Sequence, residues 1–179
     1  MYYNPYYAHL LSPNLSKHVC CLNTKSIMDL LRSKCEMRTL ASKYIPIVPF
    51  ERITGKELYN KLSLINSSKA SKWIVQENIS SGGEGTFVIS DKKKIPIYQE
   101  NSIFLLAPYY EKSIPLSVNF IIFNDKILIF PPSIQIIQHL NGKLLFMGTD
   151  FNIEKYDDYL KKDIIWQNTY QLASVLKSM

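Results

Sequence analysis

The sequence predicts an α+β fold, because segments with helical spacing of apolar residues alternate with short apolar segments typical of strands. Its 179 residues suffice for one domain or for two small lobes that share a cleft. A third observation concerns glycine. Three of the 6 glycines lie within residues 80–86 (SSGGEGT), between two predicted strands. This arrangement is a strand–loop–strand unit rather than a loop that opens a helix.

The elements before the glycine run follow from periodicity and from breakers. Residues 1–25 are rich in tyrosine, show no sustained period and are expected to form an irregular arm. Proline cannot continue a helix, so Pro46 ends the first one. Thr54 is suited to cap the second. The expected elements are a helix over 26–43, a strand over 47–50, a helix over 54–65 and a strand over 73–77.

The elements after the glycine run are mostly strands. Asn124-Asp125 lies between two apolar segments and predicts a hairpin, and Asn141-Gly142 predicts a second one. Helical spacing returns near the C-terminus. The expected elements are strands over 86–90, 103–110, 116–123, 127–130 and 134–137, a loop over 150–156 and a helix over 157–177.

Composition narrows the class of protein. The formal net charge is +6, but the lysines are scattered and form no basic stripe with aromatic platforms, so no nucleic-acid partner is expected. No stretch has the apolar length of a membrane span, and the polar start is not a signal peptide, so a cytoplasmic location is the default expectation. The three cysteines and three histidines lack zinc-ligand spacing and are expected to be structural.

Two interpretations of the glycine run compete. Gly-Gly and Ser-Gly also mark ordinary hairpin turns, but a simple hairpin needs only two residues, fewer than residues 80–86 provide. Backbone without Cβ atoms bends through positive φ and brings N–H groups close to an anion, and the serine hydroxyls add donors. The run therefore favours a loop over nucleotide phosphates, with a plain turn as the alternative.

Three known phosphate loops do not fit. The Walker A loop needs Gly-Lys-Ser or Gly-Lys-Thr at the start of a helix, and the sequence has neither. The dinucleotide fingerprint also opens a helix, and its spacing is absent. Residues 83–88 (GEGTFV) and Asp150-Phe151 imitate parts of a protein kinase. However, no Val-Ala-Ile-Lys strand and no His-Arg-Asp motif is present, and the chain is too short for two kinase lobes.

From about residue 26 onward the order of segments resembles that of the ATP-grasp superfamily. The matching motifs are Lys34 with Met37-Arg38, residues 45–49 (IPIVP), the strand–glycine loop–strand unit, residues 105–111 (LLAPYYE) and residues 117–119 (SVN). The resemblance implies an ATP-grasp-like α+β fold of two small lobes with a nucleotide cleft between them, the second lobe being incomplete. The glycine-loop lobe would span about 46–110, and the partial second lobe 26–45 plus 111–179, within an ATP-grasp-like region of 26–179.

The resemblance also implies ATP as the ligand and gives roles to residues. Residues 80–86 would cover the β- and γ-phosphates, and Lys34 would contact phosphate unless it is an ordinary solvated lysine. The carbonyl of Ala107 and the N–H of Tyr110 would read the adenine edge. Tyr109 and Phe87 would border the base, with packing between lobes as the alternative for the tyrosines, and Glu111 would hold the ribose. The expected nucleotide-binding residues are Lys34, Gln76, Ser80, Ser81, Gly82, Gly83, Gly85, Thr86, Ala107, Tyr109, Tyr110 and Glu111.

Two residues depart from the family pattern. The family usually has a lysine where this chain has Gln76, and glutamine brings no charge, so weaker ATP affinity or altered phosphate recognition is expected. Ala107 and Pro108 stand where a glutamate is common. A contact made by the Ala107 carbonyl would survive that change.

Complete ATP-grasp relatives join a carboxylate to an amine or thiol through an acyl phosphate, with Mg²⁺ held by carboxylates that follow the last helix. The sequence ends at Met179, before that region, so no metal ligands and no catalytic residues are assigned. A truncated ATP-binding protein is therefore expected. The alternatives are one half of a split ligase and a non-catalytic nucleotide-binding or interaction module. The final helix, with Leu160, Ile164, Leu172 and Leu176, is expected to associate with a second copy or a partner chain.

Overall fold

The computed structural model describes residues 14, 24–65, 72–89, 99–154 and 162–179. The arm expected at residues 1–25 therefore lies almost entirely outside the described part of the chain. The described residues combine helices with antiparallel strands, which confirms the predicted α+β class.

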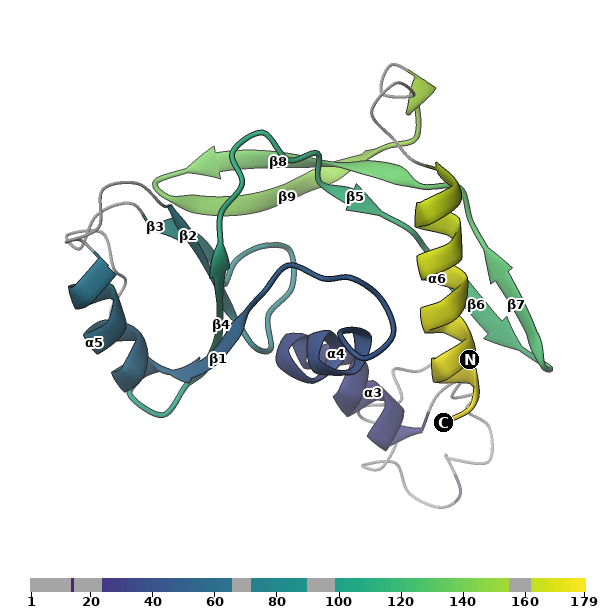
Figure 1. Ribbon diagram of the computed structural model, residues 1–179, viewed down its shortest axis with the longest axis horizontal. Helices are drawn as coiled ribbons and strands as arrows, with labels where there is room; N and C mark the ends of the chain where they lie inside the picture. The colour runs from purple at the N-terminus through teal and green to yellow at the C-terminus, as the bar shows by residue number, and fades with distance from the viewer. Residues whose placement is uncertain (1–13, 15–23, 66–71, 90–98, 155–161) are drawn as a thin grey trace.

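Seven antiparallel strands form one sheet: β1 (Glu51–Thr54), β2 (Trp73–Glu77), β3 (Thr86–Ile89), β4 (Ile103–Pro108), β5 (Leu116–Ser117), β8 (Ser133–Leu140) and β9 (Lys143–Asp150). Their spatial order is β1-β4-β2-β3-β9-β8-β5, and Figure 1 shows that the sheet curves into an arch. A single residue pair, Phe87 with Lys143, joins β3 to β9. That pair connects the strands around the glycine loop with the β8–β9 hairpin.

The first predicted helix is two helices, α3 (Lys25–Arg32) and α4 (Lys34–Ala41), so the expectation of one continuous helix is wrong. Ser33 lies between them with φ −82° and ψ 107°, outside the helical region. Its hydroxyl accepts a hydrogen bond from the N–H of Glu36 at 3.2 Å and so caps α4. Serine favours this capping role over a helix interior, which explains the break.

The strand expected at 47–50 is also wrong, because those residues pair with none of the strands in the described part of the chain. Pro46 and Pro49 have no N–H to donate, which disfavours a ladder there. Pairing starts directly afterwards: β1 runs antiparallel to β4, from Glu51 opposite Leu106 to Thr54 opposite Ile103.

Helix α5 (Gly55–Ile65) begins where the sequence predicts. The Thr54 hydroxyl accepts from the N–H of Glu57 at 3.3 Å, and the Glu57 carboxylate accepts from the N–H of Thr54 at 2.7 Å. This reciprocal pair is a capping box, which confirms Thr54 as the cap. The side chains of the predicted face at Leu62 and Ile65 lie outside the described part.

The strand expected over 116–123 is broken at Val118-Asn119 into β5 and β6 (Phe120–Phe123). Strand β6 leaves the large sheet and pairs with β7 (Lys126–Ile129) in a separate two-stranded sheet. Both predicted hairpin turns are present. Asn124 and Asp125 adopt φ of 45° and 61°, and Asn141 and Gly142 adopt 50° and 81°, as tight hairpin turns require.

Helix α6 (Lys162–Lys177) packs against β6 and β7 on the inner side of the arch (Figure 1). Lys177 Nζ donates to the carbonyl oxygen of Asp125 at 2.7 Å and so ties the helix to the β6–β7 turn. Strands β6 and β7 therefore cover part of the helix face that was expected to be uncovered, and Ile164 on that helix is 48% exposed. Residue Leu160 lies outside the described part.

The sheet around β4 is packed on both faces. Phe104 and Leu106 point to one face, where they join the buried cluster with Leu58 of α5. Leu105 and Ala107 alternate to the other face and pack with Cys35 of α4. Because α4 covers the same face of β4 as Ala107, it borders the inner space of the arch where the site lies.

We predict that Leu58→Ala lowers the free energy of unfolding by about 2–5 kcal/mol, because Leu58 is 0% exposed in the main cluster. The adjacent Tyr59→Ala is the matched control, since Tyr59 is 68% exposed, and it should change stability by less than about 0.5 kcal/mol. Urea unfolding followed by circular dichroism measures both. Equal losses in the two variants would contradict this packing of α5.

Candidate functional site

A cavity of about 1010 Å³ lies on the inner side of the arch, between α4, the glycine loop, the hinge after β4 and the β8–β9 hairpin. Every predicted site residue except Gly85 lines it: Lys34, Gln76, Ser80, Ser81, Gly82, Gly83, Thr86, Ala107, Tyr109, Tyr110 and Glu111. Gly85 is buried inside the loop, where a Cβ would come within 2.8 Å of the Glu77 side chain and of Ser80 Oγ. Gly85 therefore shapes the loop rather than the cavity wall.

The glycine loop is built from two turns. The N–H of Glu84 donates to the carbonyl of Ser81 at 3.2 Å, and the N–H of Thr86 donates to the carbonyl of Gly83 at 2.9 Å. Gly82 and Gly83 adopt φ of 63° and 82°, a region that residues with a Cβ other than asparagine and aspartate rarely adopt. The path of the chain therefore favours glycine at both positions.

The same loop is fastened to β9. The N–H of Phe146 in β9 donates to the carbonyl of Gly82 at 2.9 Å, and beside the loop the N–H of Val88 in β3 donates to the carbonyl of Gly142 in the β8–β9 turn at 2.8 Å. A Cβ at Gly83 would lie only 2.0 Å from the carbonyl oxygen of Leu144. Backbone approaches backbone here at a distance that glycine alone allows, and this contact closes one side of the cavity.

Lys34 lies at the first turn of α4 and reaches under the glycine loop. Its ammonium donates to the carbonyl of Glu77 at 3.0 Å, to the carbonyl of Ser80 at 2.8 Å and to Ser80 Oγ at 2.9 Å. Burial lowers the pKa of Lys34, and the Glu77 carboxylate partly offsets this effect. Lys34 therefore supports the glycine loop, and the positive charge of Lys34 borders the cavity.

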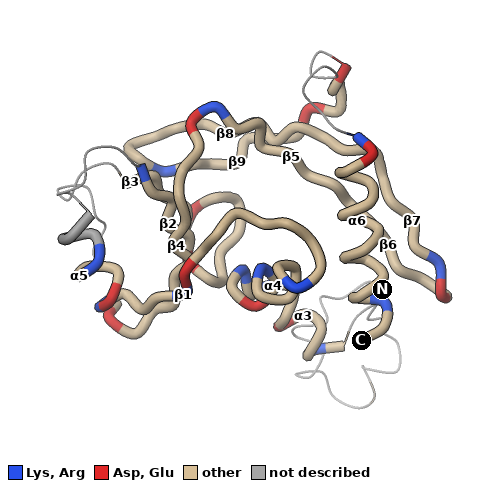
Figure 2. Tube along the Cα trace, viewed as in Figure 1, with Lys and Arg blue, Asp and Glu red and all other residues tan. Residues whose placement is uncertain are grey.

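Arg38, one helical turn after Lys34, also lines the cavity, although it was not among the predicted site residues. Its Nη2 donates to Gln76 Oε1 at 3.2 Å, and Gln76 Nε2 donates to Thr86 Oγ1 at 3.4 Å. Burial lowers the pKa of the Arg38 guanidinium. In Figure 2 the basic positions of α4 lie on the inner side of the arch. The helical spacing of Lys34 and Arg38 is the signal that could have identified Arg38.

The hinge after β4 corrects one expected contact. Tyr109 N–H donates to the carbonyl of Lys72 at 2.9 Å, and hydrogen-bonded pairs alternate along an antiparallel ladder. The next such pair is Ala107 with Ile74, so the Ala107 carbonyl accepts from β2 and does not face the cavity edge. The alternation turns the carbonyl of Pro108 and the N–H of Tyr110 to the opposite edge. The carbonyl at that edge is therefore that of Pro108 and not that of Ala107.

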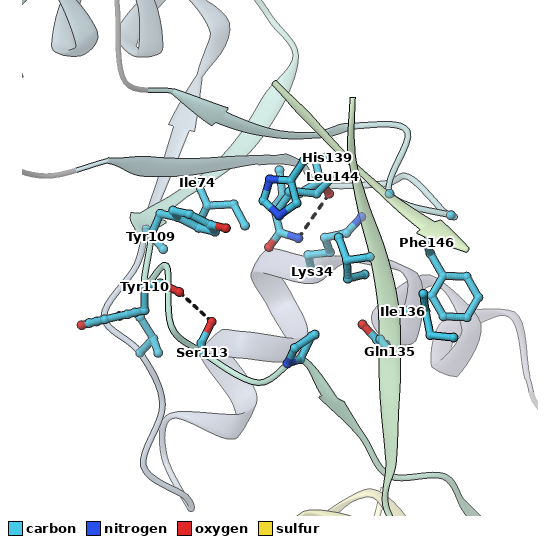
Figure 3. Close-up of a pocket in the computed structure, with 18 of the residues that line it drawn as sticks. Lys34, Ile74, Tyr109, Tyr110, Ser113, Gln135, Ile136, His139, Leu144 and Phe146 are labelled. Carbon is cyan, nitrogen blue, oxygen red and sulfur yellow. Dashed lines mark hydrogen bonds between the residues drawn. The ribbon is translucent and has the colours of Figure 1, made fainter. Parts of the chain in front are cut away.

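The aromatic residues near the hinge separate into two environments. Tyr109 lines the cavity, and its ring meets His139 of β8 edge to face, with ring centroids 6.4 Å apart. Figure 3 shows Tyr109, Ile74 and His139 grouped at one end, with Lys34 further along the cavity. Phe87 is only 8% exposed, belongs to the main core cluster and does not line the cavity where it was expected to border the base.

Two carboxylates, Glu111 and Asp150, border the cavity. Glu111 forms an ion pair with Lys72, and that hydrogen bond and charge lower the pKa of Glu111. Asp150 Oδ1 accepts from the N–H of Asn152 at 2.9 Å. Among the described residues no group of three or more His, Cys, Asp or Glu side chains converges, so they do not form a cage for the Mg²⁺ that the family resemblance implies.

The β8–β9 hairpin supplies most of the cavity wall that sequence reasoning missed. The side chains are Ile134, Gln135, Ile136, Ile137, His139, Leu144 and Phe146. Figure 3 shows Gln135, Ile136 and Phe146 on the side opposite the hinge tyrosines. Their alternation predicts strands but not the partner of β9, because the pairing of β3 with β9 joins residues far apart in the chain.

The described architecture is the ATP-grasp fold, which comparison with solved structures shows. A carboxyaminoimidazole ribonucleotide synthase from Aspergillus clavatus, complexed with ATP, matches with a TM-score of 0.59 and 12% identity over 88% of this chain and 42% of that one. An N5-carboxyaminoimidazole synthetase from Staphylococcus aureus, complexed with ADP, matches with a TM-score of 0.55 and 17% identity over 92% and 43%. The chain thus spans less than half the length of these structures.

The sequence comparisons give no match: no protein-family model fits the chain, and no curated protein resembles it in sequence. The resemblance to the ATP-grasp superfamily is therefore confirmed at the level of the fold. None of the helices in the described ranges has the length and apolarity needed to cross a membrane.

We predict that Gly83→Ala opens the contact between the glycine loop and β9, whereas Gly82→Ala opens it less. Both substitutions place a Cβ at positive φ, at a cost of about 1–2 kcal/mol. A Cβ at position 83 would meet the backbone of Leu144, whereas a Cβ at position 82 would have no neighbouring atom within 4 Å. Hydrogen exchange at the amide of Phe146, which donates to Gly82, reports the contact. Equal loss of protection in both variants would refute the close approach.

Proposed function

We propose that the chain binds ATP in this cavity, with the adenine at the hinge and the phosphates under the glycine loop. One observation carries the proposal. A backbone edge suited to a base, a loop with two glycines at positive φ and two basic side chains converge on a single cavity of about 1010 Å³. A volume of this size is at the upper end of the range for small-molecule sites.

The hinge end offers the groups that adenine recognises. Adenine presents an amino donor beside a ring nitrogen acceptor, and the Pro108 carbonyl with the Tyr110 N–H forms the complementary acceptor and donor. Within the described residues neither group takes part in a backbone hydrogen bond. Ile74 and Tyr109 line the cavity beside them and supply apolar surface for the base.

The loop end offers groups suited to phosphate. Glycine backbone at positive φ can turn successive N–H groups toward an anion, and the hydroxyls of Ser80 and Ser81 lie in the same wall. The charges of Lys34 and Arg38 give this end a positive potential. The ligand is thereby oriented with its polyphosphate toward α4.

We further propose that the bound ATP serves a ligation of a carboxylate to an amine or thiol through an acyl phosphate. The fold shared with two synthetases, one solved with ATP and one with ADP, supports this step. Because the chain spans less than half of those structures, the reaction and its substrates rest on the fold and on the nucleotide site alone. Release of ADP over a panel of carboxylates with amines or thiols, with Mg²⁺ present, tests it.

We predict that the chain binds ATP and that ITP binds at least about tenfold more weakly. Inosine replaces the amino group of adenine by a carbonyl oxygen, which would face the Pro108 carbonyl with no proton between them. Titration calorimetry with ATP, ITP and AMP measures the three affinities. Equal affinity for ATP and ITP would show that the base does not bind at the hinge. Absence of binding of any nucleotide would refute the proposed function.

A further inference from the structure

The glycine-loop end of the cavity contains two cations, but they are not equivalent. Lys34 and Arg38 lie four residues apart on α4, so their side chains leave the same face of the helix. Both line the cavity. Their hydrogen bonds decide which of the two has donors left for a ligand.

The donors of Lys34 are already used. An ammonium has three N–H groups, and the three acceptors at 2.8–3.0 Å are the carbonyls of Glu77 and Ser80 and the hydroxyl of Ser80. Donating to a phosphate would require Lys34 to release the start of the glycine loop. Its role is therefore to hold the loop in place.

Arg38 is in the opposite situation. A guanidinium has five N–H groups, and within the described residues Arg38 donates one hydrogen bond, to Gln76 Oε1 at 3.2 Å, and forms no ion pair. Burial of this unpaired cation lowers its pKa, and an anion in the cavity would relieve the cost. Gln76 is held in turn by its contact with Thr86 Oγ1 at 3.4 Å, so the amide fixes the direction of the guanidinium.

We infer that Arg38 is the principal phosphate-binding side chain of this site, and that Gln76 is its positioning partner. The inference rests on the proposed function, since it concerns the same ATP site. A guanidinium can bind two phosphate oxygens at once in a planar geometry, which a single ammonium cannot do. The neutral side chain at position 76 then follows from the neighbouring charge, because a second cation there would face Arg38 at close range.

The first test compares nucleotides that differ in phosphate number. We expect Arg38→Met to weaken ATP and ADP by at least about tenfold and to leave adenosine within about twofold. Arg38→Lys should recover part of the affinity. Arg52→Met is the matched control for charge, because Arg52 is exposed, pairs with Glu36 and does not line the cavity. Titration calorimetry and competition binding give the affinities, and thermal unfolding without ligand checks that each variant is folded.

The second test exchanges the charge between the two positions. Gln76→Lys alone is expected to leave ATP affinity unchanged or to weaken it, because the new ammonium is repelled by Arg38. In the Arg38→Met background the same Gln76→Lys change is expected to restore about tenfold of the lost affinity. If Gln76→Lys tightens ATP equally with and without Arg38, the two positions do not share one phosphate site and the inference is wrong.

The failures of the two proposals have different signatures. If the wild-type chain binds neither ATP nor ADP, the proposed function fails. If the wild-type chain binds both nucleotides and Arg38→Met binds them equally well, ATP binding stands and the role of Arg38 is overturned. A loss of ATP affinity in Arg52→Met as large as that in Arg38→Met would also overturn it, because long-range charge would then explain the effect.

Discussion

The contact between the glycine loop and β9 is the constraint on which the cavity depends. Backbone hydrogen bonds from Phe146 to Gly82 and from Val88 to Gly142 bring the β8–β9 hairpin against the loop, and the pair Phe87–Lys143 continues the sheet across this junction. They hold the hairpin against the glycine loop, while the pairing of β5 with the start of β8 holds its other end. The absence of a Cβ at Gly83 is the condition for this approach, so a local backbone property determines the shape of a site built from distant segments.

Local signals in the sequence predict local features of the structure. The glycine run, the cap at Thr54 and the two hairpin turns depend on residues close together in the chain, and each is present. The break at Ser33 was missed because a capping serine and a helical serine look alike until the chain has turned. The position of the Pro108 carbonyl at the hinge edge was missed for a different reason: it depends on the register of β4 against β2, which residue types do not encode.

In the candidate site, too, the sequence predicts local features but not those that depend on the folded structure. The residues of the loop and hinge could be found from the resemblance of short motifs, since they follow one another in the chain. The different hydrogen bonds of Lys34 and Arg38 could not be predicted, because they depend on which oxygen atoms lie within reach of each nitrogen. The cavity walls formed by β8 and β9 could not be predicted either, because they depend on pairing between residues more than fifty positions apart, such as Phe87 with Lys143.

The β6–β7 hairpin has a consequence for how the protein loses structure. Among the described residues it pairs with no strand of the large sheet, and α6 packs against one of its faces. Two-stranded sheets are marginal without such support. Its outer face exposes Ile121, Phe123 and Leu128. Little buried apolar surface therefore holds the hairpin and α6 in place. The hairpin and α6 should therefore unfold together at a lower free energy than the core around Phe104, as one cooperative unit of local unfolding that leaves the rest of the sheet paired.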